Sequence, residues 1–411
     1  MKIYYDFTGC SLERVNSKKI ARILNAVTTD DIFEADVIIL YFCVISIEEI
    51  KYIKPILDAT NKMKGVNPDL KVFAGGCAKE VLNLNKYGNL DGTFRRGHMI
   101  EDLAPFLNYD PEKAIFPMPD RGGITIGLGC DYRKCGFCKK QYLPMPLTSK
   151  SPDYVLSEVK AAVSEGFGDI VLQAENSTEY GLDLTPSVNL LQLLKSICAL
   201  EGVNFLTIHG LCLDELIRDE ELLEYIKNNS KIRKVQLEAQ SLTPVIRKNM
   251  RLSSSVDDVI HVFRELKRKY IISNIMVGYP GENSHNFEEM LDLIKKKDLH
   301  FIQPNQYVNT PLTYGSTLTQ VPKIESNLRS IILLNCIKKL RENFAKKLLG
   351  TTVTCVYTTE EIFEMLEHSA TVELNNKKIY SYGQTIVVKI TGIVSLVDSL
   401  DFTLRFEGEE L

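Results

Sequence analysis

The chain has 411 residues, of which 45% are hydrophobic and 25% are charged, and its formal net charge is −4. This length is enough for two or three domains, and the composition is ordinary for a soluble globular protein. No uninterrupted run of about 18 apolar residues occurs, which excludes a membrane-spanning helix.

The chain contains ten cysteines, and its first five residues lead into a strand-like segment instead of an apolar secretory signal. We therefore expect a cytoplasmic protein whose cysteines are reduced and able to bind metal. The charge is unevenly distributed, since residues 350–411 hold four basic and ten acidic side chains. An acidic C-terminal segment disfavours contact with nucleic-acid phosphates.

Residues 1–112 have the pattern of a separate, Rossmann-like α/β domain. Strands are predicted at Lys2–Phe7, Val37–Phe42 and Lys71–Gly75, and helices at Ser17–Ala26 and Ile47–Met63. A Pro- and Gly-rich segment, residues 117–123, predicts a linker to the next domain.

Each strand of this first domain ends at a cysteine, namely Cys10, Cys43 or Cys77. A lone cysteine is most often buried as a small apolar residue. Parallel strands bring their carboxyl ends to the same edge of a sheet, so these three thiols are expected to meet there. The repetition favours an iron–sulfur cluster with one open iron.

Residues 121–345 alternate short apolar runs with amphipathic helical stretches, the pattern of successive βα units with a parallel sheet. Six units are too few for a closed eight-stranded barrel and predict an open (βα)6 partial TIM barrel. The predicted strands are Ile124–Leu128, Asp169–Gln173, Asn204–Ile208, Lys234–Leu237, Ile271–Val277 and Phe301–Gln303. The predicted helices are Asp153–Glu165 with Ser151 as N-cap, Ser187–Leu200, Glu215–Lys227, Val256–Lys269 and Asn286–Lys297.

Each predicted barrel strand is followed by polar, sulfur-bearing or Gly-rich residues. In βα barrels the active site is built from the loops at these carboxyl ends of the strands. The segments are the cysteine loop 130–138, then 173–176, 209–210, 238–241, 278–282 and 305–307.

The cysteine loop contains Cys130, Cys135 and Cys138 within nine residues. Three thiolates on one loop can hold three irons of a [4Fe–4S] cluster and leave the fourth iron open for a ligand. The alternative is a structural zinc site, which requires a fourth closing ligand. The next ligand types in the chain are distant and form no second Cys-x-x-Cys pair, which favours the cluster; they are Cys198, His209 and Cys212.

Residues 350–411 show alternating strand patterns typical of a small all-β barrel. Strands are predicted at Thr352–Tyr357, Thr371–Leu374, Thr385–Ile393 and Leu400–Phe406.

With these features, nearly the whole chain resembles the radical S-adenosylmethionine methylthiotransferases. The first cysteine of the loop is separated from the second by four residues, where that family usually has three. The resemblance rests on Thr8-Gly9-Cys10, Cys43, Gly75-Gly76-Cys77, the loop with Gly136-Phe137-Cys138, Gln240-Ser241, Met250-Arg251, 175–181 with Asp183, and 278–282.

The resemblance implies two [4Fe–4S] clusters and S-adenosylmethionine as cofactors, and a TRAM-like C-terminal barrel. Cys130, Cys135 and Cys138 would hold the catalytic cluster, and Cys10, Cys43 and Cys77 the auxiliary one. The cofactor would be cleaved to a 5′-deoxyadenosyl radical, and a methylthio group would then be inserted into an unactivated C–H bond. The residues implied to contact S-adenosylmethionine are Phe137, Gln173, Glu175, Asn176, Gln240, Ser241, Arg251, Gly278 and Pro280.

Three functional hypotheses remain at this point. Residues 305–307 and 320–322 resemble the archaeal and eukaryotic branch of the family that modifies threonylcarbamoyl-adenosine in tRNA. The second hypothesis is the same chemistry on a basic protein or peptide, which the acidic C-terminal segment would suit. The third is a non-catalytic iron–sulfur or zinc module. Either enzyme would need an electron donor such as flavodoxin or ferredoxin.

Overall fold

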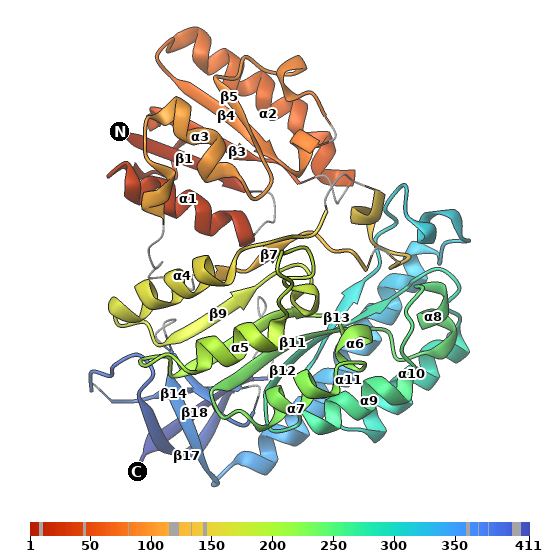
Figure 1. The fold of residues 1–411 in the computed structure, drawn as a ribbon. Helices are drawn as coiled ribbons and strands as arrows, with labels where there is room; N and C mark the ends of the chain where they lie inside the picture. Colours follow the sequence, from red (N-terminus) through yellow and green to blue (C-terminus); the bar gives the residue numbers. More distant parts are fainter. Residues whose placement is uncertain are drawn as a thin grey trace.

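Three structural parts follow one another along the chain in the computed structural model, with the N-terminal part and the C-terminal barrel at opposite ends of a central partial barrel (Figure 1). The predicted α/β fold class, with its open partial barrel and small all-β barrel, is confirmed. The structure describes residues 1–7, 11–43, 47–80, 82–114, 123–132, 134–142, 146–358, 362–368, 370–376, 378–396 and 404–411.

The N-terminal part is a parallel sheet in the order β2-β1-β3-β4-β5. Its central strand, β3, is buried along its whole length. Helices α1 and α3 pack together on one face and α2 lies on the other, as right-handed crossovers require (Figure 1). The elements are β1 (Lys2–Phe7), α1 (Ser11–Ile23), β2 (Val27–Thr28), β3 (Val37–Tyr41), α2 (Ile47–Val66), β4 (Lys71–Gly76), β5 (Gly92–Arg95) and α3 (Met99–Leu107).

The central part is an open sheet of six parallel strands in chain order, β6-β9-β10-β11-β12-β13. A large apolar core fills the space between this sheet and its helices. The strands are β6 (Ile124–Thr125), β9 (Asp169–Gln173), β10 (Phe205–Leu211), β11 (Ile232–Gln240), β12 (Tyr270–Val277) and β13 (Ile302–Gln306). The helices are α4 (Pro152–Ser164), α5 (Leu190–Cys198), α6 (Leu213–Leu216), α7 (Glu220–Asn228), α8 (Pro244–Asn249), α9 (Val256–Glu265), α10 (Ser284–Lys296) and α11 (Lys323–Leu348).

The predicted first strand of the partial barrel, Ile124–Leu128, is wrong as a single strand. Its first half is β6, which pairs with β9. Its second half, β7 (Gly127–Leu128), turns away and pairs antiparallel with β8 (Thr148–Ser149). This small ribbon forms the base of the cysteine loop.

The predicted helix Glu215–Lys227 is also wrong as one element. The chain forms α6 and then starts α7 afresh, because the side chain of Asp219 accepts a hydrogen bond from Leu222 N and caps a new helix. Helix α4, in contrast, begins at its predicted N-cap, where Ser151 Oγ accepts from Tyr154 N.

The C-terminal part is a closed five-stranded barrel in the order β14-β15-β16-β18-β17. Its strands are β14 (Thr352–Tyr357), β15 (Phe363–Met365), β16 (Ala370–Leu374), β17 (Thr385–Ser395) and β18 (Leu404–Glu410). The start of the predicted strand Leu400–Phe406 lies outside the described residues, as does most of the predicted linker 117–123.

A buried ion cluster joins this barrel to the amino ends of β9 and β11. Arg233 pairs with Glu364 of β15 and lies 3.4 Å from Asp169 Oδ2. Lys234 Nζ lies 3.4 Å from the other oxygen of Glu364. Although burial acts in the opposite direction, the charges of Lys234 and Arg233 hold the pKa of Glu364 at about 2.

None of the described helices is both long enough and apolar enough to span a membrane.

Replacing Arg233 with Met will leave the buried carboxylate of Asp169 without its paired cation and that of Glu364 with Lys234 alone, and will destabilise the chain by about 3–5 kcal/mol. Urea unfolding of the full chain, followed by circular dichroism, measures this change. Lys378→Met is the control, because the ion pair of Lys378 with Glu410 is solvent-exposed on the lysine side and contributes little. An equal loss in both variants would contradict the importance of the buried cluster.

The stability that Glu364 contributes will depend on pH. Its pKa in the folded protein is about 2 and its ordinary value is 4.5, so the ionised form stabilises the fold above about pH 4.5. This contribution is lost as the pH falls from about 4.5 to about 2. The stability difference between the wild type and Glu364→Gln, measured by urea unfolding at several pH values, should shrink in that window and stay constant above it.

Candidate functional site

The three cysteines of the predicted cluster loop gather beyond β7, at the carboxyl-terminal side of the barrel strands. Cys130, Cys135 and Cys138 act on one another electrostatically: burial, then the neighbouring Cys138 and Cys130, raise the pKa of the Cys135 thiol. Cys138 N donates to Cys135 O at 3.0 Å, which closes a tight turn between the last two.

A buried carboxylate anchors the first half of this loop. Tyr132, between the first two cysteines, donates its hydroxyl hydrogen to Asp214 of α6. Arg247 of α8 lies 3.0 Å from the other oxygen of Asp214. Burial acts in the opposite direction, but hydrogen bonds from Ser254 and Tyr132 hold the pKa of Asp214 below its usual value. The loop is therefore tied to two helices of the partial barrel.

The second half of the loop is held at Gly136. Its N–H donates to Met250 O and its carbonyl accepts from Gly315 N, both at 2.7 Å. A Cβ at this position would lie 2.8 Å from the Tyr279 hydroxyl and 2.9 Å from Asn249 O. Neighbouring backbone and side-chain atoms therefore lie so close to Gly136 that any residue with a Cβ would clash with them.

Phe137, predicted to pack near the adenine of the cofactor, lies in a small apolar cluster beneath the loop. Its neighbours in that cluster include Ile246, Met250 and Tyr279. The side chain therefore supports the loop from the barrel side.

Two of the three N-terminal cysteines are in contact with each other. Cys43 follows β3 and Cys77 follows β4. A hydrogen bond with Cys43, opposed by burial and aided by the charge of Arg96, lowers the pKa of Cys77 to about 7. The Tyr41 hydroxyl lies 3.3 Å from Cys77 Sγ. The third predicted ligand, Cys10, lies outside the described residues.

The two cysteine groups approach each other across the boundary between the N-terminal part and the partial barrel. Lys139, next to Cys138, interacts electrostatically with Cys43, although burial is the larger influence and lowers the pKa of the lysine. Glu175 likewise lies within electrostatic reach of Cys77. The edges on which the sequence analysis expected the two groups therefore lie against each other.

Polar residues after β9 surround the first cysteine of the loop. Asn176 Nδ2 lies 3.7 Å from Cys130 Sγ and 2.7 Å from Glu215 Oε2. Glu179 accepts from Asp131 N at 2.7 Å. Burial and the neighbouring Glu215 raise the pKa of Glu179 to about 7.

The other two predicted cofactor contacts after β9 have protein partners. Gln173 Nε2 donates to Gly123 O at 3.2 Å. Glu175 accepts from Gly129 N at 2.7 Å and pairs with both Arg96 and Lys140.

Gln240 and Ser241, both predicted to contact the cofactor at the end of β11, have different hydrogen-bond partners. Gln240 has a φ of +61° and donates through Nε2 to Glu238 Oε2 at 2.8 Å. Gln236 Nε2 donates to the other oxygen of Glu238 at 2.9 Å, and burial raises the pKa of this glutamate. Ser241 is buried, and its hydroxyl accepts from Thr243 N at 3.2 Å.

Arg251 is exposed and lies over an aromatic ring. Its guanidinium carbon is 3.8 Å from the centre of the Tyr314 ring. The residue has a φ of +58°, so the chain turns sharply there.

The segment after β12 is a rigid, buried turn. Gly278 N donates to Glu282 Oε1 at 2.9 Å, and the same oxygen lies 2.9 Å from Arg329 of α11. Pro280 O accepts from Asn249 Nδ2 at 3.3 Å. A Cβ on Gly278 would lie 2.1 Å from the Ser326 hydroxyl, so this turn also requires glycine.

Several charged residues that shape the site were not predicted from the sequence. Arg96 and Lys140 belong to no periodic pattern, and their role becomes visible only where the two parts of the molecule meet. Asp214 lies in a short helix that was predicted to begin one residue later. Glu238 belongs to the strand-end segment 238–241 noted in the sequence, but it was given no role there.

The cysteine loop offers the thiolate donors that a [4Fe–4S] cluster uses. Among the residues that the structure describes, no three His, Cys, Asp or Glu side chains converge closely enough to hold one metal ion. A [4Fe–4S] cluster takes each thiolate on a different iron, so its ligands surround a volume instead of one point. Three neighbouring thiols on one loop meet that requirement.

Comparisons with known proteins support the same interpretation. Residues 124–294, from β6 to α10, match the family model of the radical SAM superfamily. The chain is 25% identical to the ribosomal protein uS12 methylthiotransferase RimO of Carboxydothermus hydrogenoformans, over 95% of this chain and 97% of that protein. It is also 25% identical to the tRNA-2-methylthio-N(6)-dimethylallyladenosine synthase of Clostridium tetani, over 98% of this chain and 95% of that protein.

Among solved structures, the chain resembles the radical S-adenosylmethionine methyltransferase TsrM from Kitasatospora setae. The TM-score is 0.55 at 12% identity, over 76% of each chain. At this level of identity the likeness concerns the fold.

Replacing Gly136 with Ala will displace the cluster loop, because the added methyl group meets backbone and ring atoms at a cost of about 1–3 kcal/mol. The purified, anaerobically reconstituted variant should hold less iron than the wild type while its circular dichroism spectrum is unchanged. Gly65→Ala in α2 is the control, since a Cβ there meets nothing within 4 Å. Full iron content in Gly136→Ala would contradict the steric argument.

Proposed function

Because the chain belongs to the radical S-adenosylmethionine methylthiotransferases, we propose that it inserts a methylthio group into an unactivated C–H bond of a tRNA adenosine next to the anticodon. The family membership makes the protein an enzyme, and the hypothesis of a non-catalytic module is therefore wrong.

The observation that carries this proposal is the approach of the two cysteine groups. Sulfur insertion requires that a substrate radical form within reach of the sulfur that captures it, and that water be kept away. Lys139, beside the cysteine loop, interacts electrostatically with Cys43, and Glu175 does so with Cys77. This arrangement supports a reaction in which both groups act on one substrate.

We assign the catalytic [4Fe–4S] cluster to Cys130, Cys135 and Cys138, and the auxiliary cluster to Cys10, Cys43 and Cys77. When bound, the first cluster supplies the electron that cleaves S-adenosylmethionine, and the second carries the sulfur. The protein holds the loop in place through Asp214 and Gly136.

The residues proposed to contact S-adenosylmethionine differ in how well they are placed to do so. Asn176 lies closest to a ligand thiol, at 3.7 Å from Cys130 Sγ. Gln240 stands at the carboxyl end of β11 with a polar side chain. Gly278 and Pro280 bring backbone close to the loop, and Arg251 is exposed at its rim. Phe137, Gln173 and Ser241 would act mainly by supporting these residues.

A tRNA substrate is favoured by the relatives. Several of them, in Clostridium novyi and Clostridium tetani among others, are tRNA-2-methylthio-N(6)-dimethylallyladenosine synthases. The threonylcarbamoyl type of adenosine is proposed from the sequence resemblance of residues 305–307 and 320–322. The electron donor and the cytoplasmic location stay predictions.

The second candidate substrate is a ribosomal protein. The relative in Carboxydothermus hydrogenoformans acts on ribosomal protein uS12. The acidic C-terminal barrel would suit a basic polypeptide. That barrel lies at the other end of the partial barrel from β3 and β4, the strands that Cys43 and Cys77 follow (Figure 1). Its charge therefore bears on docking and not on the reaction itself.

Substituting one cysteine group at a time will separate the two clusters. The reconstituted wild type should hold about eight irons, four for each [4Fe–4S] cluster. Cys130→Ala/Cys135→Ala/Cys138→Ala should lose about half of the iron and all 5′-deoxyadenosine formation, because it lacks the catalytic cluster. Cys43→Ala/Cys77→Ala should lose the other half and still form 5′-deoxyadenosine.

Cys336→Ala, on α11, is the matched control and should behave as the wild type. Formation of 5′-deoxyadenosine by the triple variant would refute the assignment of the radical site.

The substrate is decided by mass spectrometry of a strain that lacks this protein. Loss of a methylthiolated adenosine from its tRNA would support the tRNA proposal. Loss of a methylthio group from a ribosomal-protein peptide, with unchanged tRNA nucleosides, would favour the second candidate.

A further inference from the structure

A single buried carboxylate, that of Glu175, connects the N-terminal part to both ends of the cysteine loop. The side chain of Glu175 is 8% exposed and pairs with Arg96, which is 7% exposed, and with Lys140. Its Oε2 also accepts a hydrogen bond from Gly129 N at 2.7 Å. Although burial acts in the opposite direction, Lys140 and Arg96 hold the pKa of Glu175 below its usual value. Both oxygens of the carboxylate are thus occupied by the protein.

The three partners of Glu175 come from three places that matter for the chemistry. Gly129 directly precedes Cys130, and Lys140 lies two residues after Cys138. Arg96 follows β5 in the N-terminal part, and its charge acts on Cys77. The side chain of Glu175 therefore contacts both ends of one cysteine group, and also an arginine whose charge acts on the other group.

We propose that Glu175 is a positioning residue that sets the separation of the two cysteine groups, by holding Arg96 and Lys140 together across the boundary between the N-terminal part and the partial barrel. This inference rests on the proposed function, in which the two groups must act on one substrate. It assigns Glu175 a role different from the contact with S-adenosylmethionine implied by the sequence resemblance.

The physical basis is the repulsion between the two cations. Arg96 and Lys140 are both largely buried and pair with the same carboxylate. Burial and the charge of Arg96 oppose the charge on Lys140, but Glu175 outweighs them and raises the pKa of the lysine. Because both cations are attracted to the carboxylate of Glu175, the N-terminal part and the partial barrel are held together at that point. Without its charge the same two cations repel each other across the boundary, in surroundings where charges are weakly screened.

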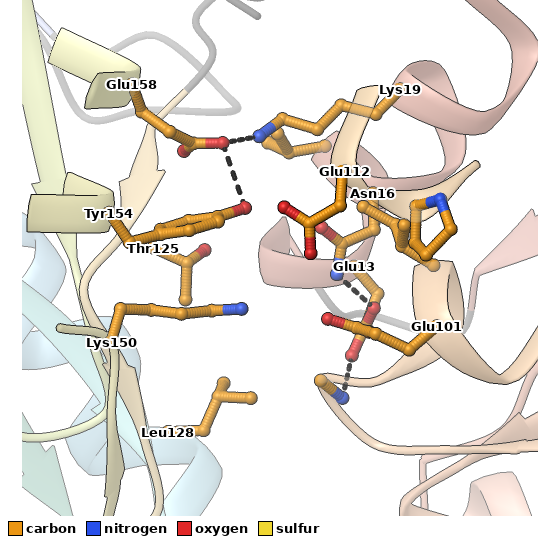
Figure 2. A pocket seen from close by; sticks show the side chains of 14 residues that line it. Glu13, Asn16, Lys19, Glu101, Glu112, Thr125, Leu128, Lys150, Tyr154 and Glu158 are labelled. Carbon is orange, nitrogen blue, oxygen red and sulfur yellow. Dashed lines mark hydrogen bonds and ion pairs between the residues drawn. The ribbon is translucent and has the colours of Figure 1, made fainter. Parts of the chain in front are cut away.

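The structure supplies a matched control on the same boundary. Lys19 of α1 and Glu158 of α4 form another buried ion pair, with exposed fractions of 5% and 7%. Figure 2 shows the pair at the edge of a cavity of about 150 Å³, where the Tyr154 hydroxyl also donates to Glu158 at 3.3 Å. None of the described residues that line this cavity is a cysteine. The pair joins the same two parts, and neither Lys19 nor Glu158 forms a hydrogen bond or ion pair with a described cysteine.

The test compares Glu175→Gln and Arg96→Met with Lys19→Met, all in the full chain. Two quantities are measured. The first is the yield of cross-links between Cys43, which is more exposed than the buried Cys77, and Cys138 in the chain before iron reconstitution, with a short bismaleimide and peptide mapping. The second is the ratio of methylthiolated product to 5′-deoxyadenosine in the reconstituted enzyme.

We expect Glu175→Gln and Arg96→Met to lose the cross-link and to lower the product ratio by about 10²-fold, the effect of a misplacement near 1 Å. Formation of 5′-deoxyadenosine should continue, because the cysteine loop is still held by Asp214 and by the hydrogen bonds of Gly136. Lys19→Met should keep both the cross-link and the ratio.

Equal effects in Lys19→Met and Glu175→Gln would overturn the inference, since any buried ion pair on the boundary would then do the same work. An unchanged cross-link in Glu175→Gln would overturn it as well. Failure of the proposed function would look different: the wild-type chain would then make no methylthiolated product, while the cross-link comparison would still report on Glu175.

Discussion

Parallel strands end at a common edge, and the site depends on two such edges meeting. The N-terminal sheet brings Cys43 and Cys77 together at the ends of β3 and β4. The partial barrel presents its cysteine loop and the polar ends of β9 to β13 at its own carboxyl edge. Neither edge alone could transfer sulfur to carbon. The buried charges of Arg96, Glu175 and Lys140 lie where the two edges approach, and the chemistry proposed for this protein requires that approach.

Much of this architecture could be predicted from the sequence, because buried parallel strands are unbroken apolar runs. The strands at Lys2–Phe7 and Asp169–Gln173 were predicted with their exact bounds. The strands β2 and β5 were missed, since two and four residues are too short to show a pattern. The cysteine loop was identifiable because three cysteines lie within nine residues, whereas Cys43 and Cys77 were identified because each follows a predicted strand.

The roles of individual polar side chains were much harder to predict. Gln173 and Ser241 stand at strand ends, as cofactor contacts would, yet their hydrogen bonds go to neighbouring backbone. Asp214 and Arg96 carry no local signal, because their partners are distant in the chain. A sequence pattern reports which edge a residue occupies, whereas its partner depends on the assembled three-dimensional structure.

The fixation of Gly136 has a consequence for the order of events in the cell. Its two backbone hydrogen bonds go to Met250 and Gly315, more than a hundred residues downstream. Such distant contacts form late in folding. The loop therefore acquires its shape only after nearly the whole central part has been synthesised, and iron loading must follow translation of that part. In this protein the metal therefore binds after the loop has folded. In small zinc domains, by contrast, the ion itself drives folding.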